Sequence, residues 1–440
     1  MNLRKQFAGY VSLNVLGMLG ISCYILADTY FISKAEGSAG LAALNLVLPV
    51  YDLIFALGSM LGTGSAIRYV IGRARGDSDS DKYIFNAIVF STLIGLIFSC
   101  IGIFFPDRLL RLLGADDNIL QKGVGYTRIF MALAPVFMWN YIANAYTRND
   151  NAPTTAMLAT LLSSIFNIVF DYVLMFPLKM GMEGAALATA LSPILGIGIC
   201  MTHFLSRKNM VKIKPCLPSF KRLFHACQVG ISAFVGEMSS CVITLIFNFL
   251  ILSLAGNTGV AAYGVVANIA LMAVAVFNGI AQGSQPLISR AYGQKSVKDI
   301  SLLKRLGIFT GLGAALVIYA GIYFCSDGIV NIFNSEGNVQ MAEYAVSGLR
   351  LYFTGIFFSG FNIVMGSFFS ATEQVGAALI ISVLRGFVLI AAAAFIMSAL
   401  FGLRGVWLSY MTAEALTGII IFFIHGLKKK KKSNTMVSND

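Results

Sequence analysis

Residues 154–176 read TTAMLATLLSSIFNIVFDYVLMF, a run long and apolar enough to cross a bilayer as one helix. The run carries one charged residue, Asp171, and an amide four residues earlier, Asn167. On a helix these two side chains lie one turn apart on the same face. A carboxylate in the hydrocarbon region is costly unless it faces a polar cavity or a partner. The run therefore predicts a membrane-spanning helix that carries a buried polar site.

The composition of the whole chain agrees with this interpretation. Of 440 residues, 57% are hydrophobic and 12% are charged, and the mean hydropathy is +0.78. Soluble domains are about 45–50% apolar and about 25% charged, so we predict an all-α polytopic membrane protein. The cysteines lack C-x-x-C spacing and the histidines are isolated, so neither disulfides nor a metal cluster is indicated. Nucleotide-binding motifs are absent from the sequence, and we predict neither an enzyme nor a bound cofactor.

Apolar runs of about 20 residues recur, and they predict twelve transmembrane helices. The first follows Arg4 and Lys5, ends near Phe31 and contains Asp28, which is unlike a cleaved signal peptide. The other eleven are expected near 41–70, 83–105, 125–147, 154–176, 183–205, 224–254, 260–289, 303–325, 342–370, 376–399 and 404–426. We predict an N-terminal lobe at 1–206, a basic linker at 207–222, a C-terminal lobe at 223–427 and a Lys-rich tail at 428–440.

Basic residues orient these helices. They gather in alternate connecting segments, at 4–5, 73–82, 207–222, 290–305 and 428–432. The positive-inside rule then places both termini in the cytoplasm of a plasma (inner) membrane protein. The net charge of +12 is a topology signal with some affinity for anionic membrane lipid, and we expect no nucleic-acid partner.

The two halves of the sequence repeat. The segment 62–72 aligns with 283–293, and similar offsets pair Gly9 with Gly230 and Asn140 with Asn362. With six helices per half, both halves enter the membrane the same way up. We therefore predict two six-helix bundles related by a pseudo-twofold axis along the membrane normal, with a substrate path at their interface.

Depth in the membrane links three helices of the first half. Asp28, the pair Asn167 and Asp171, and Thr189 are all expected in the extracellular half of their helices. Carboxylates with an amide and a hydroxyl suit a hard cation such as Na⁺. A buried carboxylate could instead hold a proton. In a third interpretation, Asn167 and Thr189 only satisfy Asp171 through hydrogen bonds.

Several motifs resemble those of the MATE (multidrug and toxic compound extrusion) transporters, in particular of their prokaryotic multidrug-export branch. The resemblance covers residues 7–426. It rests on Asp28-Thr29, Asn167-x-x-x-Asp171, Gly181-x-Glu183-Gly184-Ala185-Ala186-x-Ala188-Thr189, Val260-Ala261-Ala262-Tyr263-Gly264 and Gln285-Pro286…Tyr292-Gly293.

The resemblance implies a monomeric, twelve-helix exporter that works by alternating access. Such an exporter would remove lipophilic or cationic drug-like molecules in exchange for inward H⁺ or Na⁺. By similarity, the cation or proton site falls on Asp28, Asn167, Asp171 and Thr189. Other polar residues within the predicted helices are candidates for the substrate cavity or for interhelical contacts. They are Tyr51, Asp52, Asn140, Asn144, Glu237, Asn248, Asn268, Arg385 and Glu414.

Three alternatives remain at this point. A flippase or exporter of a lipid-linked or metabolite substrate would share the architecture but should have a strongly cationic cavity. A receptor or scaffold would keep Asp171 for structural reasons, although the internal repeat argues against it. A channel would show passive current.

Overall fold

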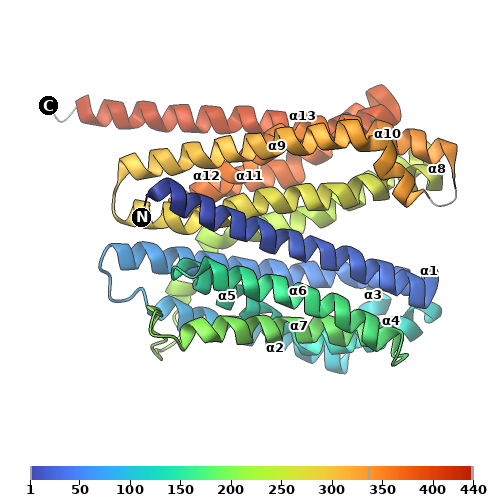
Figure 1. Ribbon diagram of the computed structural model, residues 1–440, viewed down its shortest axis with the longest axis horizontal. Coiled ribbons are helices and arrows are strands. Elements are labelled where there is room, and N and C mark those ends of the chain that lie inside the picture. Colours follow the sequence, from blue (N-terminus) through green and yellow to red (C-terminus); the bar gives the residue numbers. More distant parts are fainter. Residues whose placement is uncertain (1, 335–336, 438–440) are drawn as a thin grey trace. The chain divides into compact units, whose positions relative to one another are not determined.

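The computed structural model describes residues 2–334 and 337–437, and over these residues the secondary structure is helical without strands (Figure 1). The first half contains seven helices. They are α1 (Leu3–Ala74), α2 (Lys82–Phe104), α3 (Pro106–Leu112), α4 (Asp117–Ala132), α5 (Ala134–Asn149), α6 (Pro153–Met175) and α7 (Gly181–Phe204).

The second half also consists of helices, some of them very long. They are α8 (Phe220–Gly293), α9 (Val297–Phe333), α10 (Val339–Tyr352), the 3-10 turn η1 (Phe353–Gly355), α11 (Ile356–Ala371), α12 (Val375–Val383), the π-helix η2 (Leu384–Val388) and α13 (Leu389–Val437). The last helix continues into the predicted tail, of which residues 438–440 lie outside the described part of the chain.

The helix boundaries match the twelve predicted spans once three glycines are taken into account. Gly37 in α1, Gly256 in α8 and Gly402 in α13 have φ values of 66°, 61° and 59°, and each interrupts a continuous helix. Glycine tolerates this left-handed conformation without the cost of a Cβ atom. Helices α1 and α8 therefore each make two passes, and α4 and α5 together make one. The eleventh pass is made by α12, η2 and the part of α13 before Gly402, and the twelfth by the part after it. The predicted multi-pass all-helical membrane fold is confirmed, and the described residues include nine apolar helices long enough to span a bilayer.

Local chemistry sets several helix starts. Pro153 opens α6 and Pro135 lies in the first turn of α5, where the missing N–H removes no helical hydrogen bond. Asp116 caps α4 by accepting a hydrogen bond from the N–H of Ile119 at 2.8 Å. Ser219 accepts from the N–H of Arg222 at the start of α8.

The repeat predicted from the sequence also shows in the backbone. Gly37 and Gly256 have nearly the same dihedral angles, with ψ of −155° and −159°. The fourth span is interrupted at Leu133, between α4 and α5, and the tenth at 353–355, between α10 and α11. Breaks at corresponding places indicate that the two halves follow one helical plan.

The chain forms two compact units. Unit 1 comprises 1–238 and 282–303, and unit 2 comprises 239–281 and 304–440. Both ends of α8 thus belong to unit 1. A Cβ atom on Gly64 of α1 would lie 2.0 Å from the carbonyl oxygen of Ala226, and one on Gly230 would lie 2.0 Å from that of Met60, so this close packing requires glycine. The predicted lobes, 1–206 and 223–427, stay a prediction.

Each unit has an aromatic-rich interior. In unit 1, α6 packs along α7 (Figure 1), and a buried cluster joins α1, α4, α5 and α7 around Phe130 and Phe137. In unit 2, α11 packs against α12 and α13. There Tyr352 stacks on Tyr410 with ring centroids 4.2 Å apart, beside the fully buried Trp407.

Candidate functional site

Helix α6 presents Asn167 and Asp171 on its buried side. Both residues are 0% exposed, whereas their neighbours Val169 and Tyr172 are about half exposed. The helix is therefore turned so that its amide and its carboxylate face the interior of unit 1 and its apolar residues face outward. This is the arrangement that the i, i+4 spacing predicts.

Thr189 of α7 lies against Asn167. The amide nitrogen of Asn167 donates to the Thr189 hydroxyl at 3.3 Å. With the amide turned by 180°, that nitrogen donates instead to Asp171 Oδ2 at 3.1 Å, and the amide oxygen accepts from Thr189 at 3.3 Å. The second orientation satisfies both groups better, because the carboxylate then receives a donor. In either orientation, three of the predicted residues are in one cluster.

Asp28 approaches the same cluster from α1. Its charge acts on Asp171, and both carboxylates act electrostatically on Tyr24 and Tyr126. One oxygen of each carboxylate, Oδ1 of Asp28 and Oδ1 of Asp171, is buried and has no hydrogen-bond partner among the residues that the structure describes. Turning the Asn167 amide satisfies Oδ2 of Asp171 but leaves Oδ1 without a donor.

Two unpartnered carboxylate oxygens define what the site can do. Buried acceptors are almost always hydrogen-bonded, so these two call for a proton, a cation or water. Carboxylate, amide and hydroxyl oxygens are the ligands of a hard cation. Because its donors are oxygens, this set suits H⁺ or Na⁺ better than a transition metal, which favours imidazole or thiolate ligands.

The predicted cavity residues of unit 1 fall into two groups. Tyr51 contacts Tyr24 through its hydroxyl at 3.3 Å and stacks on Phe130 at 4.6 Å, while Asp52 and Glu237 interact electrostatically. The second group makes interhelical contacts. Asn144 donates to the Ala156 carbonyl at 3.0 Å and to Thr160 at 2.8 Å, and Asn140 lies against Gly196 of α7.

Two predicted residues of unit 2 bind each other instead. Arg385 Nε donates to Glu414 Oε1 at 2.6 Å, which is the internal salt bridge that the sequence left open. Asn362 donates to Glu414 Oε2 at 2.6 Å and Arg385 donates to Ser359 at 3.1 Å. Arg385 lies in the π-helix η2, an element often found at functional positions. Asn248 and Asn268 are partly buried, and their role stays a prediction.

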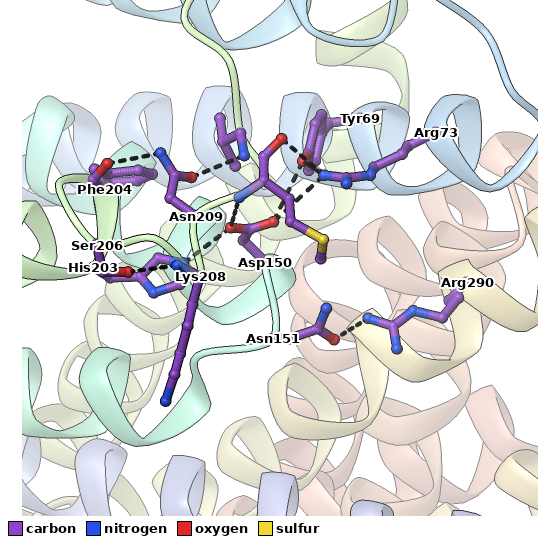
Figure 2. Close-up of polar contacts among 12 residues, drawn as sticks. Tyr69, Arg73, Asp150, Asn151, His203, Phe204, Ser206, Lys208, Asn209 and Arg290 are labelled. Carbon is purple, nitrogen blue, oxygen red and sulfur yellow. Dashed lines mark hydrogen bonds and ion pairs between the residues drawn. The ribbon is translucent and has the colours of Figure 1, made fainter.

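Sequence reasoning missed a second polar region, where α5 ends. Arg148 is 5% exposed and its guanidinium donates to amide oxygens of Asn14 at 3.3 Å and of Gln282 at 2.9 Å. Asp150 is fully buried and lies 2.9 Å from His203 Nε2 (Figure 2). The signal was present in four consecutive polar residues, Arg148 to Asn151, which directly follow the predicted span at 125–147.

These features define the class of protein: a multi-pass helical membrane protein of twelve spans with a buried carboxylate pair in its first unit. The chain belongs to the MatE family, whose profile matches residues 15–173 and 233–396.

Curated relatives and solved structures agree with this assignment. "Multidrug export protein MepA" of Staphylococcus aureus (strain bovine RF122 / ET3-1) is 27% identical over 417 residues, which cover 93% of this chain and 90% of the relative. A structure described as the "Outward-facing conformation of a multidrug resistance MATE family transporter of the MOP superfamily" is 23% identical with a TM-score of 0.92, covering 99% of this chain and 97% of that one.

A second solved structure shares the fold but differs in its described function. It is a transporter from Pyrococcus furiosus, 23% identical with a TM-score of 0.89, covering 97% of this chain and 96% of that one. It is described by the words "Reverse polarity of binding pocket suggests different function of a MOP superfamily transporter". At this identity, both structures show the fold of the chain.

Proposed function

We propose that this protein is a secondary active multidrug efflux antiporter, which exports lipophilic or cationic compounds in exchange for inward H⁺ or Na⁺ by alternating access. Membership of the MatE family supports a transporter. The MepA relatives, named as multidrug export proteins, support export as the direction and drugs as the cargo.

One observation carries the proposal: the pair of unpartnered carboxylate oxygens on Asp28 and Asp171. A chain that only needed to pack these helices could place apolar residues at both positions and avoid the cost of burying charge. Two carboxylates with a spare acceptor each are suited to binding a cation, and Asn167 and Thr189 supply further oxygen ligands.

The site can couple the two fluxes through opposing effects on binding. An H⁺ or Na⁺ that enters from outside cancels one negative charge of the Asp28–Asp171 pair and so weakens the negative field that favours a cationic drug. The drug leaves, the ion-loaded protein returns to its inward-open state, and release of the ion restores the field. Linkage requires the drug to weaken ion binding by the same factor, typically 1–3 kcal/mol of coupling free energy.

A second candidate function is the export or flipping of a lipid-linked or metabolite substrate. The solved structure from Pyrococcus furiosus supports this second candidate, because its description suggests a different function for a transporter with the same fold. The two proposals differ in the charge of the cargo: the carboxylate pair favours a cation, whereas a lipid-linked phosphate needs a cationic site.

Gradient-driven dye efflux tests the proposal. The purified protein is reconstituted in vesicles, an inward H⁺ or Na⁺ gradient is imposed, and efflux of a fluorescent cationic dye is recorded for wild type, Asp171→Asn and a control, Asp107→Asn, whose carboxylate is exposed on α3. We expect one gradient to drive efflux by wild type and the control but not by Asp171→Asn. Gradient-independent efflux, or full efflux by Asp171→Asn, would overturn the proposal.

We also propose how the protein works in the cell. It acts as a monomer in the plasma membrane, with both termini cytoplasmic, in contact with membrane lipid and without nucleic acid or a cofactor beyond the coupling ion. A tag after Asp440 should react with an impermeant reagent only in opened cells. Labelling in intact cells would contradict this topology.

A further inference from the structure

A cavity of about 240 Å³ lies within unit 1, and its lining includes neither member of the carboxylate pair. It is formed by the last turns of α1 and α8, by the turn that follows α5, and by Met210 in the segment after α7. The predicted topology places this end of the helices at the cytoplasmic face. The volume is below the roughly 300–1,000 Å³ typical of drug-sized ligand sites, so a small ligand or a headgroup fits better.

Two arginines from different helices line the cavity, Arg73 of α1 and Arg290 of α8 (Figure 2). Arg73 Nη1 donates to the Met210 carbonyl at 2.9 Å and lies 3.6 Å from Asp150 Oδ1. Arg290 has neutral partners instead: its guanidinium donates to the side-chain oxygen of Asn151 and interacts with the Tyr10 hydroxyl. Within the described part of the chain, these partners of Arg290 are uncharged, so they do not compensate its positive charge.

Asp150 is the one carboxylate among the described lining residues, and its acceptor capacity is already used. Its side chain is fully buried, and it lies 2.9 Å from His203 Nε2 and accepts from the N–H of Met210 at 2.8 Å. The Tyr69 hydroxyl donates to its other oxygen at 3.4 Å. Asp150 thus holds the segment after α7 in place, and only Arg73 among the two arginines lies near it.

With two arginines and one carboxylate in its described lining, the cavity has an excess of positive charge. Neutral amide groups of Asn149, Asn151 and Gln294 complete its polar lining. Arginine binds phosphate oxygens through charge-assisted, often bidentate hydrogen bonds. Basic pockets between transmembrane helices on the cytoplasmic side suit anionic headgroups. We propose that this cavity binds a phosphoryl anion between Arg73 and Arg290, carried by an anionic phospholipid or present as free phosphate.

Such an anion would connect the ends of α1 and α8 at the cytoplasmic face. A ligand that binds the folded protein raises its apparent stability with the logarithm of the ligand concentration. Binding can therefore be measured as a rise in unfolding temperature, independently of transport. This readout keeps the inference separate from the proposed antiport.

The test uses the purified full-length protein in neutral detergent micelles at constant ionic strength. Its unfolding temperature is recorded against short-chain phosphatidylglycerol, short-chain phosphatidylcholine and inorganic phosphate. The variants are Arg73→Gln and Arg290→Gln, with Arg207→Gln as the matched control, since Arg207 is an exposed arginine in the predicted cytoplasmic linker and outside the cavity.

We expect phosphatidylglycerol or phosphate, but not phosphatidylcholine, to stabilise wild type and Arg207→Gln. Each cavity variant should need at least about tenfold more ligand than wild type for the same rise in unfolding temperature, as expected for the loss of a hydrogen bond between charged groups. Stabilisation by phosphatidylglycerol alone supports the proposal with lipid as the source, and stabilisation by phosphate supports it with the free anion as a source.

Two results would overturn the proposal. One is the absence of any shift in wild type with either anion. The other is an equal weakening in Arg207→Gln, which would indicate general attraction to a basic surface. If Arg290→Gln does not fold, Arg290→Lys takes its place; it keeps the charge and should retain stabilisation by the anion that stabilises wild type.

Discussion

The Asp28–Asp171 pair of unit 1 and the Glu414 cluster of unit 2 both contain buried carboxylate oxygens, but they differ in how these oxygens are satisfied. In unit 2, Glu414 accepts from Arg385 through Oε1 and from Asn362 through Oε2, both at 2.6 Å. In unit 1, Asp28 and Asp171 each keep a buried oxygen without a donor. The charge of Glu414 is compensated by Arg385, whereas the described residues offer the unpartnered oxygens of Asp28 and Asp171 no donor.

We propose that this difference separates a carboxylate pair that binds the coupling ion from a carboxylate that holds helices together. A buried ion pair with a full set of hydrogen bonds holds helices together, and breaking it is costly because one charge remains buried alone. A carboxylate pair without a compensating positive charge is stabilised when a cation or a proton binds to it. Glu414 is therefore expected to matter for stability, and Asp171 for transport.

The largest expected effect is on transport by Asp28→Asn and Asp171→Asn. Either change removes a carboxylate that has an unpartnered oxygen, so driven dye efflux should fall at least tenfold, to the level of empty vesicles. The unfolding temperature should stay level or rise, because a buried charge is removed. Parallel efflux and thermal-unfolding measurements check both expectations, and a strong loss of stability would assign these residues a packing role.

The next effect is on stability, in Glu414→Gln. This change leaves the partly buried Arg385 without its charged partner. Breaking a fully buried pair costs about 3–5 kcal/mol, which sets the upper end of the expected loss. The unfolding temperature should drop clearly, while efflux per folded molecule should still respond to the ion gradient.

A double variant, Arg385→Met with Glu414→Leu, serves as the control for this prediction. It replaces the pair by apolar groups of similar size and should recover much of the lost stability. If Glu414→Gln instead abolished ion coupling with normal stability, the division between the two clusters would be wrong.

A smaller effect is expected for Thr189→Val, which keeps the side-chain volume and removes one oxygen ligand of the site. Loss of one hydrogen bond or ligand contact of about 1 kcal/mol should raise the ion concentration needed for half-saturation about fivefold. The maximum efflux rate should change little. The matched control is Thr202→Val, an exposed hydroxyl on the same helix. An equal change in both variants would show that the Thr189 hydroxyl does not contact the ion.

Much of this organisation could be predicted from the sequence, because apolar length and charge placement determine transmembrane helices directly. The twelve spans and the cluster of Asn167, Asp171 and Thr189 depend on spacing within and between neighbouring helices. The break between α4 and α5 at Leu133 was not predicted, although Pro135, two residues later, is a sequence signal for such a break.

Contacts between residues far apart in the sequence could not be predicted. Nothing in the spacing of Arg385 and Glu414 shows that they pair rather than face a cavity, because the choice depends on how α12, η2 and α13 pack. The contacts of Asp150 with His203 and Met210 likewise join segments more than fifty residues apart. A buried ion pair and a ligand site have similar residues in the sequence and differ only in their partners.

The most direct test of the central claim is ion displacement by drug in the purified protein. A cationic dye is added to the protein in weakly buffered detergent solution, and released H⁺ and displaced radioactive Na⁺ are measured for wild type, Asp171→Asn and Glu414→Gln. We predict that wild type and folded Glu414→Gln release one of these ions and that Asp171→Asn releases neither. Equal release by wild type and Asp171→Asn would contradict the assignment of the coupling site to this carboxylate pair.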